Sequence, residues 1–178
     1  MEIIFIRHAD KEGMGENPSL TKKGIKQAKY LAKRLRKFKK FDEFYCSNLD
    51  RAKRTAEIVS KKIRVRPRVK ESLNEFETEI FHERKPKWGK KEKRHYEELI
   101  SFLKKISKNP DDKKRVLIIC HGLTNRIILS YFLELDLDKT IRFRQRETGI
   151  NSIYWVDKFE NWRLKYWNDN NHIPERFR

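Results

Sequence analysis

Two histidines in this sequence each follow directly after a run of apolar residues. Arg7 and His8 come after residues 3–6, and His121 comes after residues 116–120. Runs of this kind are typical of strands that are covered on both faces. In an open α/β sheet, ligands bind at the edge where the parallel strands end. An imidazole at that edge can act as a nucleophile or a base, and an arginine as a fixed cation.

A second arginine and a carboxyl group complete this candidate site. Arg51 lies in the first turn of a predicted helix, where free N–H groups and a guanidinium together suit a phosphate. Glu75 lies in an irregular segment, with Glu77 and Glu79 close by. Two arginines can hold the oxygens of a dianion, a histidine can attack phosphorus, and a carboxylic acid can protonate the leaving oxygen. The sequence leaves open which of the three glutamates is that acid.

Strands and helices alternate along most of the chain, which predicts a sheet that is largely parallel. We expect an α/β fold, a three-layer α/β/α sandwich with a mostly parallel central sheet. Hydrophobic periodicity predicts helices from Thr21 to about residue 37, after Asn48, around residues 96–106, and after His121. Thr21 is a good N-cap for the first of these helices, and either Ser47 or Asn48 can cap the second. Strands are expected at residues 1–6, 41–46, 115–120, 149–156 and 162–167. The last two strands should form a hairpin, and the polar tail after Asn168 should be loosely held.

The length of 178 residues suits one domain that spans the whole chain, residues 1–178. Residues 76–95 are expected to form a short insertion, because the segment is basic and contains Pro86, Trp88 and Gly89. Such segments often cover a site and select substrates. Its cations indicate an anionic substrate; the basic side chains are His82, Arg84, Lys85, Lys87, Lys90 and Lys91.

Composition narrows the classes of function. The net charge is +18 and the isoelectric point about 9.9, which indicates anionic partners or, alternatively, the ion-paired surface of a thermophile. The longest apolar run, residues 116–120, is far too short to span a membrane, and no secretory signal is visible. Two cysteines without a CxxC motif favour the cytoplasm and argue against disulfides and zinc. We therefore expect no metal and no cofactor.

Several segments, in this order, resemble the motifs of the histidine phosphatase superfamily, the phosphoglycerate mutase-like fold. Residues 7–10 (RHAD) are similar to its Arg-His-Gly-Glu motif, and residues 47–56 (SNLDRAKRTA) to its Ser-x-Leu-x-Arg-Ala-x-x-Thr-Ala signature. Four other segments also resemble motifs of this family; they are residues 20–28, residues 73–75, His121-Gly122 and residues 151–153. Ala9 stands where the family usually has glycine, and Asp10 replaces a longer Glu or Gln.

This resemblance implies a role for each candidate residue. His8 would be the nucleophile that becomes phosphohistidine, and Glu75 the proton donor. Arg7, Arg51 and His121 would hold the phosphoryl group, with His121 also counted among the catalytic residues. The resemblance implies a metal-independent phosphatase that acts on a small anionic phosphometabolite or a phosphoprotein. The sequence does not indicate the oligomeric state.

Three alternatives remain at this stage. Phosphoglycerate mutase-type transfer is less favoured, because mutases have a long lid and the segment at residues 81–94 is short. Residues 120–126 spell a Cys-x5-Arg loop, the pattern of a cysteine phosphatase, with Cys120 as nucleophile and Arg126 as anion ligand. The net positive charge and the aromatic residues are also compatible with a basic protein that binds nucleic acid. No nucleic-acid-binding motif is visible, so we do not expect nucleic acid as a partner.

Overall fold

The fold was analysed in a computed structural model, which describes residues 1–13, 15, 17–38, 40–76 and 88–177. Its elements follow the predicted alternation of strands and helices. The strands are β1 (Glu2–Arg7), β2 (Glu43–Ser47), β3 (Arg68–Lys70), β4 (Arg115–Cys120), β5 (Ile150–Val156) and β6 (Asn161–Asp169). The helices are α1 (Lys22–Leu35), α2 (Asp50–Ile63), α3 (Lys90–Ile106) and α4 (Gly122–Leu133).

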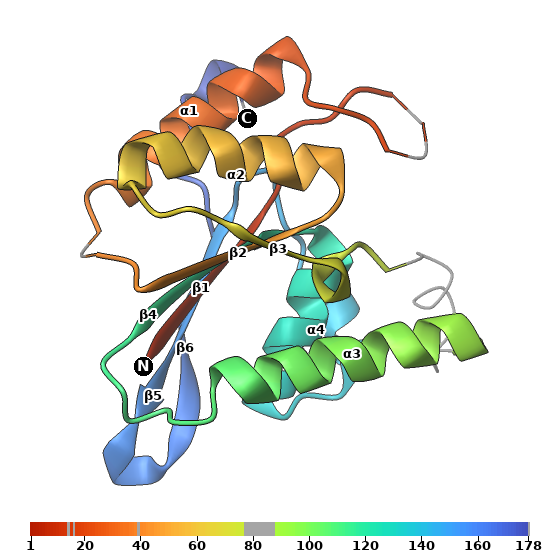
Figure 1. Cartoon of the computed structure of the whole chain (residues 1–178), viewed down its shortest axis with the longest axis vertical. Helices are drawn as coiled ribbons and strands as arrows, with labels where there is room; N and C mark the ends of the chain where they lie inside the picture. Colours follow the sequence, from red (N-terminus) through yellow and green to blue (C-terminus); the bar gives the residue numbers. More distant parts are fainter. Residues whose placement is uncertain (14, 16, 39, 77–87, 178) are drawn as a thin grey trace.

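The six strands form one sheet in the order β3-β2-β4-β1-β5-β6. The first four are parallel to one another, whereas β5 pairs with both β1 and β6 in the antiparallel direction. Helices α1 and α2 cover one face of the sheet, and α3 and α4 cover the other (Figure 1). This arrangement confirms the predicted α/β sandwich with a mostly parallel central sheet.

The alternation of side chains along β1 divides the core into two layers. Ile3 and Phe5 pack into the cluster under α3 and α4, whereas Ile4 and Ile6 pack into the cluster under α1 and α2. All four side chains are fully buried. Because β1 is buried on both faces, its apolar run is unbroken, and the polar residues that follow this run, Arg7 and His8, come at the end of the strand.

Most boundaries follow from local signals in the sequence. Thr21 is the N-cap of α1, and its hydroxyl accepts a hydrogen bond from the N–H of Gly24 at 2.8 Å. The α2 helix differs from expectation, because its N-cap is Leu49 and neither Ser47 nor Asn48 caps it with a side chain. Ser47 Oγ instead accepts a hydrogen bond from the Leu49 N–H at 3.1 Å, before the helix begins.

The segment expected to be an insertion is only partly described. Phe76 is buried in the core, and residues 90–95 form the first turns of α3. Glu77, Glu79, His82, Arg84, Lys85 and Lys87 lie outside the described residues. Within the described part of the chain, no helix combines the length and apolar character that crossing a membrane requires.

The tail after Asn168 is more ordered than predicted. Ile173 is fully buried, and Asn170 is 8% exposed. The backbone carbonyl of Phe177 accepts a hydrogen bond from Gln27 Nε2 on α1 at 2.9 Å. The prediction of a loosely held tail is therefore wrong, because a single isoleucine among polar residues carries no periodic signal.

Candidate active site

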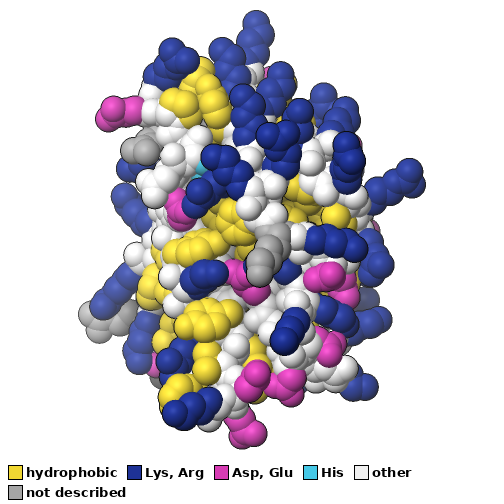
Figure 2. All heavy atoms as spheres, turned by 90° about the vertical axis from the view of Figure 1, so that its left-hand side faces the viewer, with side chains coloured by type: hydrophobic (Ala, Val, Ile, Leu, Met, Phe, Trp, Pro, Cys, Tyr) yellow, Lys and Arg dark blue, Asp and Glu magenta, His cyan; other side chains and the backbone are white. Residues whose placement is uncertain are grey.

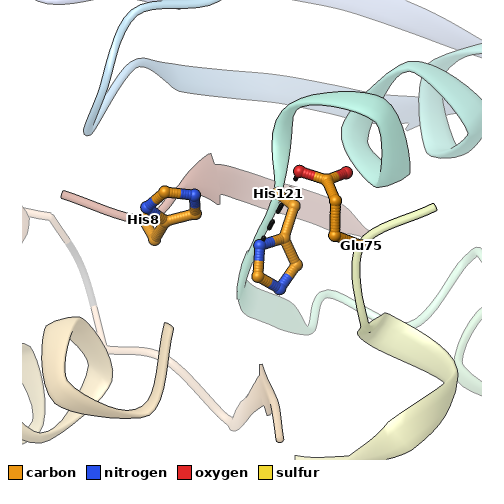
Figure 3. A group of neighbouring side chains, drawn as sticks. All are labelled: His8, Glu75 and His121. Carbon is orange, nitrogen blue, oxygen red and sulfur yellow. Dashed lines mark ion pairs between the residues drawn. The ribbon is translucent and has the colours of Figure 1, made fainter. Parts of the chain in front are cut away.

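All five predicted site residues come from the carboxyl-terminal edge of the sheet or from segments that begin there. Arg7 ends β1, and His8 follows it; His121 stands between β4 and α4. Arg51 lies in the first turn of α2, and Glu75 follows the short 3-10 helix at Glu71–Leu73. The rings of His8 and His121 lie 5.1 Å apart between centroids, and Glu75 lies beside His121 (Figure 3).

A backbone carbonyl fixes the orientation of the His8 ring. Its Nδ1 lies 2.7 Å from the carbonyl oxygen of Ala9, so Nδ1 carries the proton and Nε2 keeps its lone pair. The Nε–H of Arg51 points at His8 Nε2 from 3.3 Å. Burial and the charges of Arg7 and Arg51 lower the pKa of His8 to about 3. The imidazole is therefore neutral at physiological pH and presents a nucleophilic nitrogen inside the site.

A side-chain relay determines which nitrogen of His121 carries its proton. The hydroxyl of Ser47 donates to Asn74 Oδ1 at 2.8 Å, so Ser47 Oγ accepts from His121 Nε2–H at 2.7 Å. His121 Nδ1 then holds a lone pair that is buried without a hydrogen-bond partner, 3.8 Å from a carboxylate oxygen of Glu75. Burial and the nearby cations hold the pKa of His121 well below its usual value. His121 is therefore a neutral imidazole whose Nδ1 lone pair faces Glu75.

Glu75 has the environment of a proton donor. Burial raises its pKa, and this effect outweighs the hydrogen bond from the Leu123 N–H at 3.1 Å and the attraction of Arg51 and Arg7. The neighbouring cations alone would favour the ionised carboxylate, and burial reverses that preference. A carboxyl with a raised pKa keeps its proton to higher pH than an ordinary one and can release it to a leaving oxygen.

Arg7 and Arg51 differ in the contacts that hold their guanidinium groups. Arg7 donates through Nη1 to the Gln145 carbonyl at 2.7 Å, and its Nη2 lies 3.1 Å from a carboxylate oxygen of Glu147. Its Nε–H is buried and has no hydrogen-bond partner, so one donor remains for an anion. Arg51 is only 7% exposed, and burial lowers its pKa. Together they place positive charge near His8, and Arg7 Nε–H is a donor without a partner among the described residues.

Several residues that support this site carried no assigned role in the sequence interpretation. Ser47 and Asn74 lie within segments that resemble family motifs, so their polarity was a usable signal. Gln145 and Glu147 come from the loop before β5, and no pattern marks them, because Gln145 binds Arg7 through its backbone carbonyl. Thr148, in the same loop, has φ of 58° and donates its N–H to the carbonyl of Arg7 at 3.0 Å.

His8, Glu75 and His121 also form a group that could hold a metal ion. One ligand atom from each lies within 4.8 Å of the others. Two imidazoles and a carboxylate suit zinc or iron. The positive charges of Arg7 and Arg51 oppose a cation at this place and favour an anion.

The structure contradicts the cysteine-phosphatase alternative. Cys120 is fully buried at the end of β4, and its Sγ–H donates to Asn125 Oδ1 at 2.8 Å. Burial raises the pKa of this thiol well above its usual value, whereas a nucleophilic cysteine needs a lowered one. The residues that follow are helical, and Arg126 Nε donates to the Phe143 carbonyl at 2.9 Å. Cys120 is therefore a core side chain.

Known structures share this fold over nearly the whole chain. A phosphoserine phosphatase from Entamoeba histolytica has a TM-score of 0.78 at 19% identity, with 97% of this chain and 99% of that chain covered. A putative alpha-ribazole-5'-P phosphatase from Escherichia coli has a TM-score of 0.80 at 19% identity, with 96% and 98% covered. A mycobacterial glucosyl-3-phosphoglycerate phosphatase has a TM-score of 0.72 at 17% identity, with 94% and 98% covered.

Comparison of the sequence with models of protein families identifies the family of this chain. No curated protein matches it. The family model described as histidine phosphatase superfamily (branch 1) matches residues 3–98 and 79–170, which together span most of the sequence. The motifs at residues 7–10 and 47–56 and the histidine at position 121 lie within this match. The chain belongs to the histidine phosphatase superfamily, branch 1.

Proposed function

We propose that this protein is a phosphomonoester hydrolase that acts through a phosphohistidine on His8. Its substrate would be a phosphorylated small molecule or a phosphoprotein. The observation that carries this proposal is the His8 ring, whose Nδ1–H is bound to the Ala9 carbonyl and whose unprotonated Nε2 accepts a hydrogen bond from the Nε–H of Arg51. A neutral imidazole that is held in this way is preorganised to attack phosphorus.

The first chemical step would form a covalent intermediate. His8 Nε2 attacks phosphorus, the bond from phosphorus to the ester oxygen breaks, and Glu75 gives its proton to that oxygen. Arg7 and Arg51 would stabilise the charge on the transferring phosphoryl oxygens, and His121 would join them when the bound dianion favours uptake of a proton at its Nδ1. In the second step, the Glu75 carboxylate takes a proton from water, the water oxygen attacks phosphorus, and the bond from phosphorus to Nε2 breaks. Phosphate leaves, and both residues return to their starting states.

Hydrolysis of p-nitrophenyl phosphate in the presence of EDTA tests this proposal. We expect activity in the wild type, a loss of at least a thousandfold in His8→Ala, and near-normal activity in Cys120→Ser. Serine can keep the hydrogen bond to Asn125, so Cys120→Ser is a matched control for the core. Acid quenching should destroy a labelled phosphoenzyme, because phosphohistidine is acid-labile. Activity that survives His8→Ala, or that EDTA abolishes, would contradict the proposed nucleophile or the proposed metal independence.

Phosphoglycerate mutase-type transfer is the second candidate, because the same phosphohistidine can pass its phosphoryl group to an alcohol instead of water. The names of the three structural neighbours above support hydrolysis. Partition of a labelled phosphoryl group between inorganic phosphate and added glycerate would distinguish the two reactions. We also propose a cytoplasmic location, which fits two buried cysteines that form no disulfide.

A further inference from the structure

The candidate active site leaves most of the positive charge without a role. The chain holds 44 Lys and Arg against 26 Asp and Glu. Residues 22–37, which comprise α1 and the turn after it, contain no acidic residue. Their basic side chains are all exposed; they are Lys22, Lys23, Lys26, Lys29, Lys33, Arg34, Arg36 and Lys37. Lys and Arg gather over the upper part of the face shown in Figure 2, at the height where Figure 1 places α1 and α2.

The surface is hollowed beside this run of cations. A hollow of about 440 Å³ lies where α1, the end of α2 and the C-terminal tail meet, and Tyr30, Asn171 and His172 form part of its wall. The rest of the wall consists of five cations, which are Lys33, Arg34, Arg36, Lys37 and Lys62. No carboxylate of a described residue lines this hollow.

A second hollow adjoins the first. It has a volume of about 310 Å³ and shares Tyr30 and Lys33 with its neighbour. Its other lining residues are Lys26, Lys29, Arg176 and Phe177, again without a carboxylate among the described residues. The two hollows lie next to each other along α1, with Tyr30 and Lys33 lining both, and we call the pair the α1 channel. None of its lining residues belongs to the catalytic cluster.

The charges of the α1 channel are not neutralised as an ion-paired thermophile surface would require. Among the described residues, Arg34 with Asp169, at 3.4 Å, is the one pair between a channel Lys or Arg and a carboxylate. Two cations in the first half of neighbouring α2 are paired, because Asp50 lies 3.1 Å from Lys53 and Glu57 lies 2.9 Å from Arg54. Unpaired like charges repel one another across a concave surface, and a bound polyanion would relieve that repulsion.

Aromatic rings in the channel favour a strand of nucleic acid over a simple anion. Tyr30 and Phe177 lie 5.9 Å apart between ring centroids, and the Lys26 ammonium lies 5.0 Å from the centre of the Phe177 ring. Tyr30 borders both hollows and is only partly buried. A basic groove with an accessible aromatic ring is the usual means of binding single strands, because cations follow the phosphates and bases stack on the ring.

We propose that the α1 channel binds single-stranded nucleic acid, independently of the candidate active site. This differs from the sequence-based expectation, which treated nucleic-acid binding as a rival to catalysis and did not expect it. The structure separates the two functions, because the channel and the catalytic cluster use different residues. The absence of a sequence motif fits this mode of binding, since the phosphate backbone is recognised by charge rather than by a fixed pattern.

Binding of fluorescently labelled dT12, followed by anisotropy between 50 and 200 mM NaCl, tests this proposal. The channel variant combines Lys26→Gln, Lys29→Gln and Lys33→Gln. Its matched control combines Lys104→Gln, Lys105→Gln and Lys108→Gln, which removes the same charge from exposed positions at the end of α3 and after it. We expect at least a tenfold loss of affinity in the channel variant and less than threefold in the control. The slope of log affinity against log salt should become shallower by about 2 in the channel variant, at roughly 0.7 per lost phosphate contact.

A further variant, Tyr30→Leu, separates stacking from charge. It should weaken dT12 binding at least fivefold and leave the salt slope unchanged. Equal losses in the two triple variants would show diffuse attraction to a basic protein and would overturn the proposal. So would the absence of dT12 binding at 50 mM NaCl, or binding to phosphatidylserine vesicles or polyphosphate that competes with dT12 and does not depend on Tyr30. Melting curves would confirm that each variant is folded.

Discussion

Each site histidine is held in one protonation form by a neighbour that does not touch the proposed substrate. The Ala9 carbonyl does this for His8, and the Ser47 hydroxyl for His121. The family motif described above usually has glycine where this chain has Ala9. The backbone carbonyl of Ala9 still binds His8 Nδ1, and the alanine side chain is fully buried. The departure at position 9 therefore leaves the orientation of His8 intact.

Glu75→Gln tests the proton donor. Glutamine keeps the size of the side chain and can still accept from the Leu123 N–H, but it has no acidic proton to give. We expect kcat for an alkyl phosphate to fall by about 10²–10⁴, the usual contribution of general acid catalysis. p-Nitrophenolate leaves without protonation, so its release in the first turnover, before Glu75 is needed to activate water, should fall far less. Equal losses for both substrates in that first turnover would show that Glu75 acts in another way, and Glu77 and Glu79 would then be tested by the same substitution.

The elements that position the site were predictable where the sequence carries periodicity. The strand at residues 115–120 was predicted with its observed bounds, and so was Thr21 as the cap of α1. The strand β3 was not predicted, because its three residues are all exposed and have no alternating pattern. The roles of Gln145 and Glu147 were equally invisible, since Gln145 binds Arg7 through its backbone carbonyl, and Glu147 pairs with Arg7 from a distant loop that no sequence pattern marks.

Gly24→Ala tests the packing of α1 against the end of β1. A Cβ atom at Gly24 would lie 2.0 Å from the carbonyl oxygen of Asp10, so the backbone would have to move. We expect a loss of about 1–3 kcal/mol in the free energy of unfolding, as for other overpacked sites, despite the better helix propensity of alanine. Gly13→Ala is the matched control, because nothing lies within 4 Å of its Cβ position. Chemical denaturation measures both, and equal stabilities would contradict the close approach.

At the scale of the whole molecule, the C-terminal tail connects α1 with the loop that holds Arg7. Asn170 Nδ2 donates to the Glu147 carbonyl at 2.9 Å, and Phe177 accepts from Gln27 on α1. Ile173 anchors the tail between these contacts, with 1% of its side chain exposed. The tail therefore contributes to the stability of the fold and to the position of an active-site loop.

Ile173→Ala tests this anchor. Removal of a buried isoleucine side chain typically costs about 2–5 kcal/mol of unfolding free energy. We expect a loss in that range, together with weaker binding of phosphate because the loop that holds Arg7 is loosened. Asn171→Ala, at an exposed neighbouring position, should change stability by less than about 0.5 kcal/mol. A stability loss near zero in Ile173→Ala would show that the tail does not pack against the domain in solution.

The free energy of unfolding should depend on pH because of the two buried histidines, His8 and His121. The pKa of His8 is about 3 in the folded protein, whereas an unfolded histidine titrates near 6.5, and the pKa of His121 is also well below that value. Between these values the unfolded chain binds more protons than the folded one, so acid favours unfolding. The stability contributed by the neutral histidines is present above about pH 6.5 and is lost as pH falls toward 3.

His8→Gln removes one of these groups and leaves all carboxyl groups in place. Each buried histidine should add about 1.4 kcal/mol per pH unit to the slope of the unfolding free energy between pH 6 and pH 4. The slope for His8→Gln should therefore be smaller than that of the wild type by about this amount. Glu75 works in the opposite direction, because its folded pKa is raised, and it contributes equally to both proteins. Denaturation at several pH values measures the two slopes, and parallel curves would mean that His8 titrates as it does in the unfolded chain.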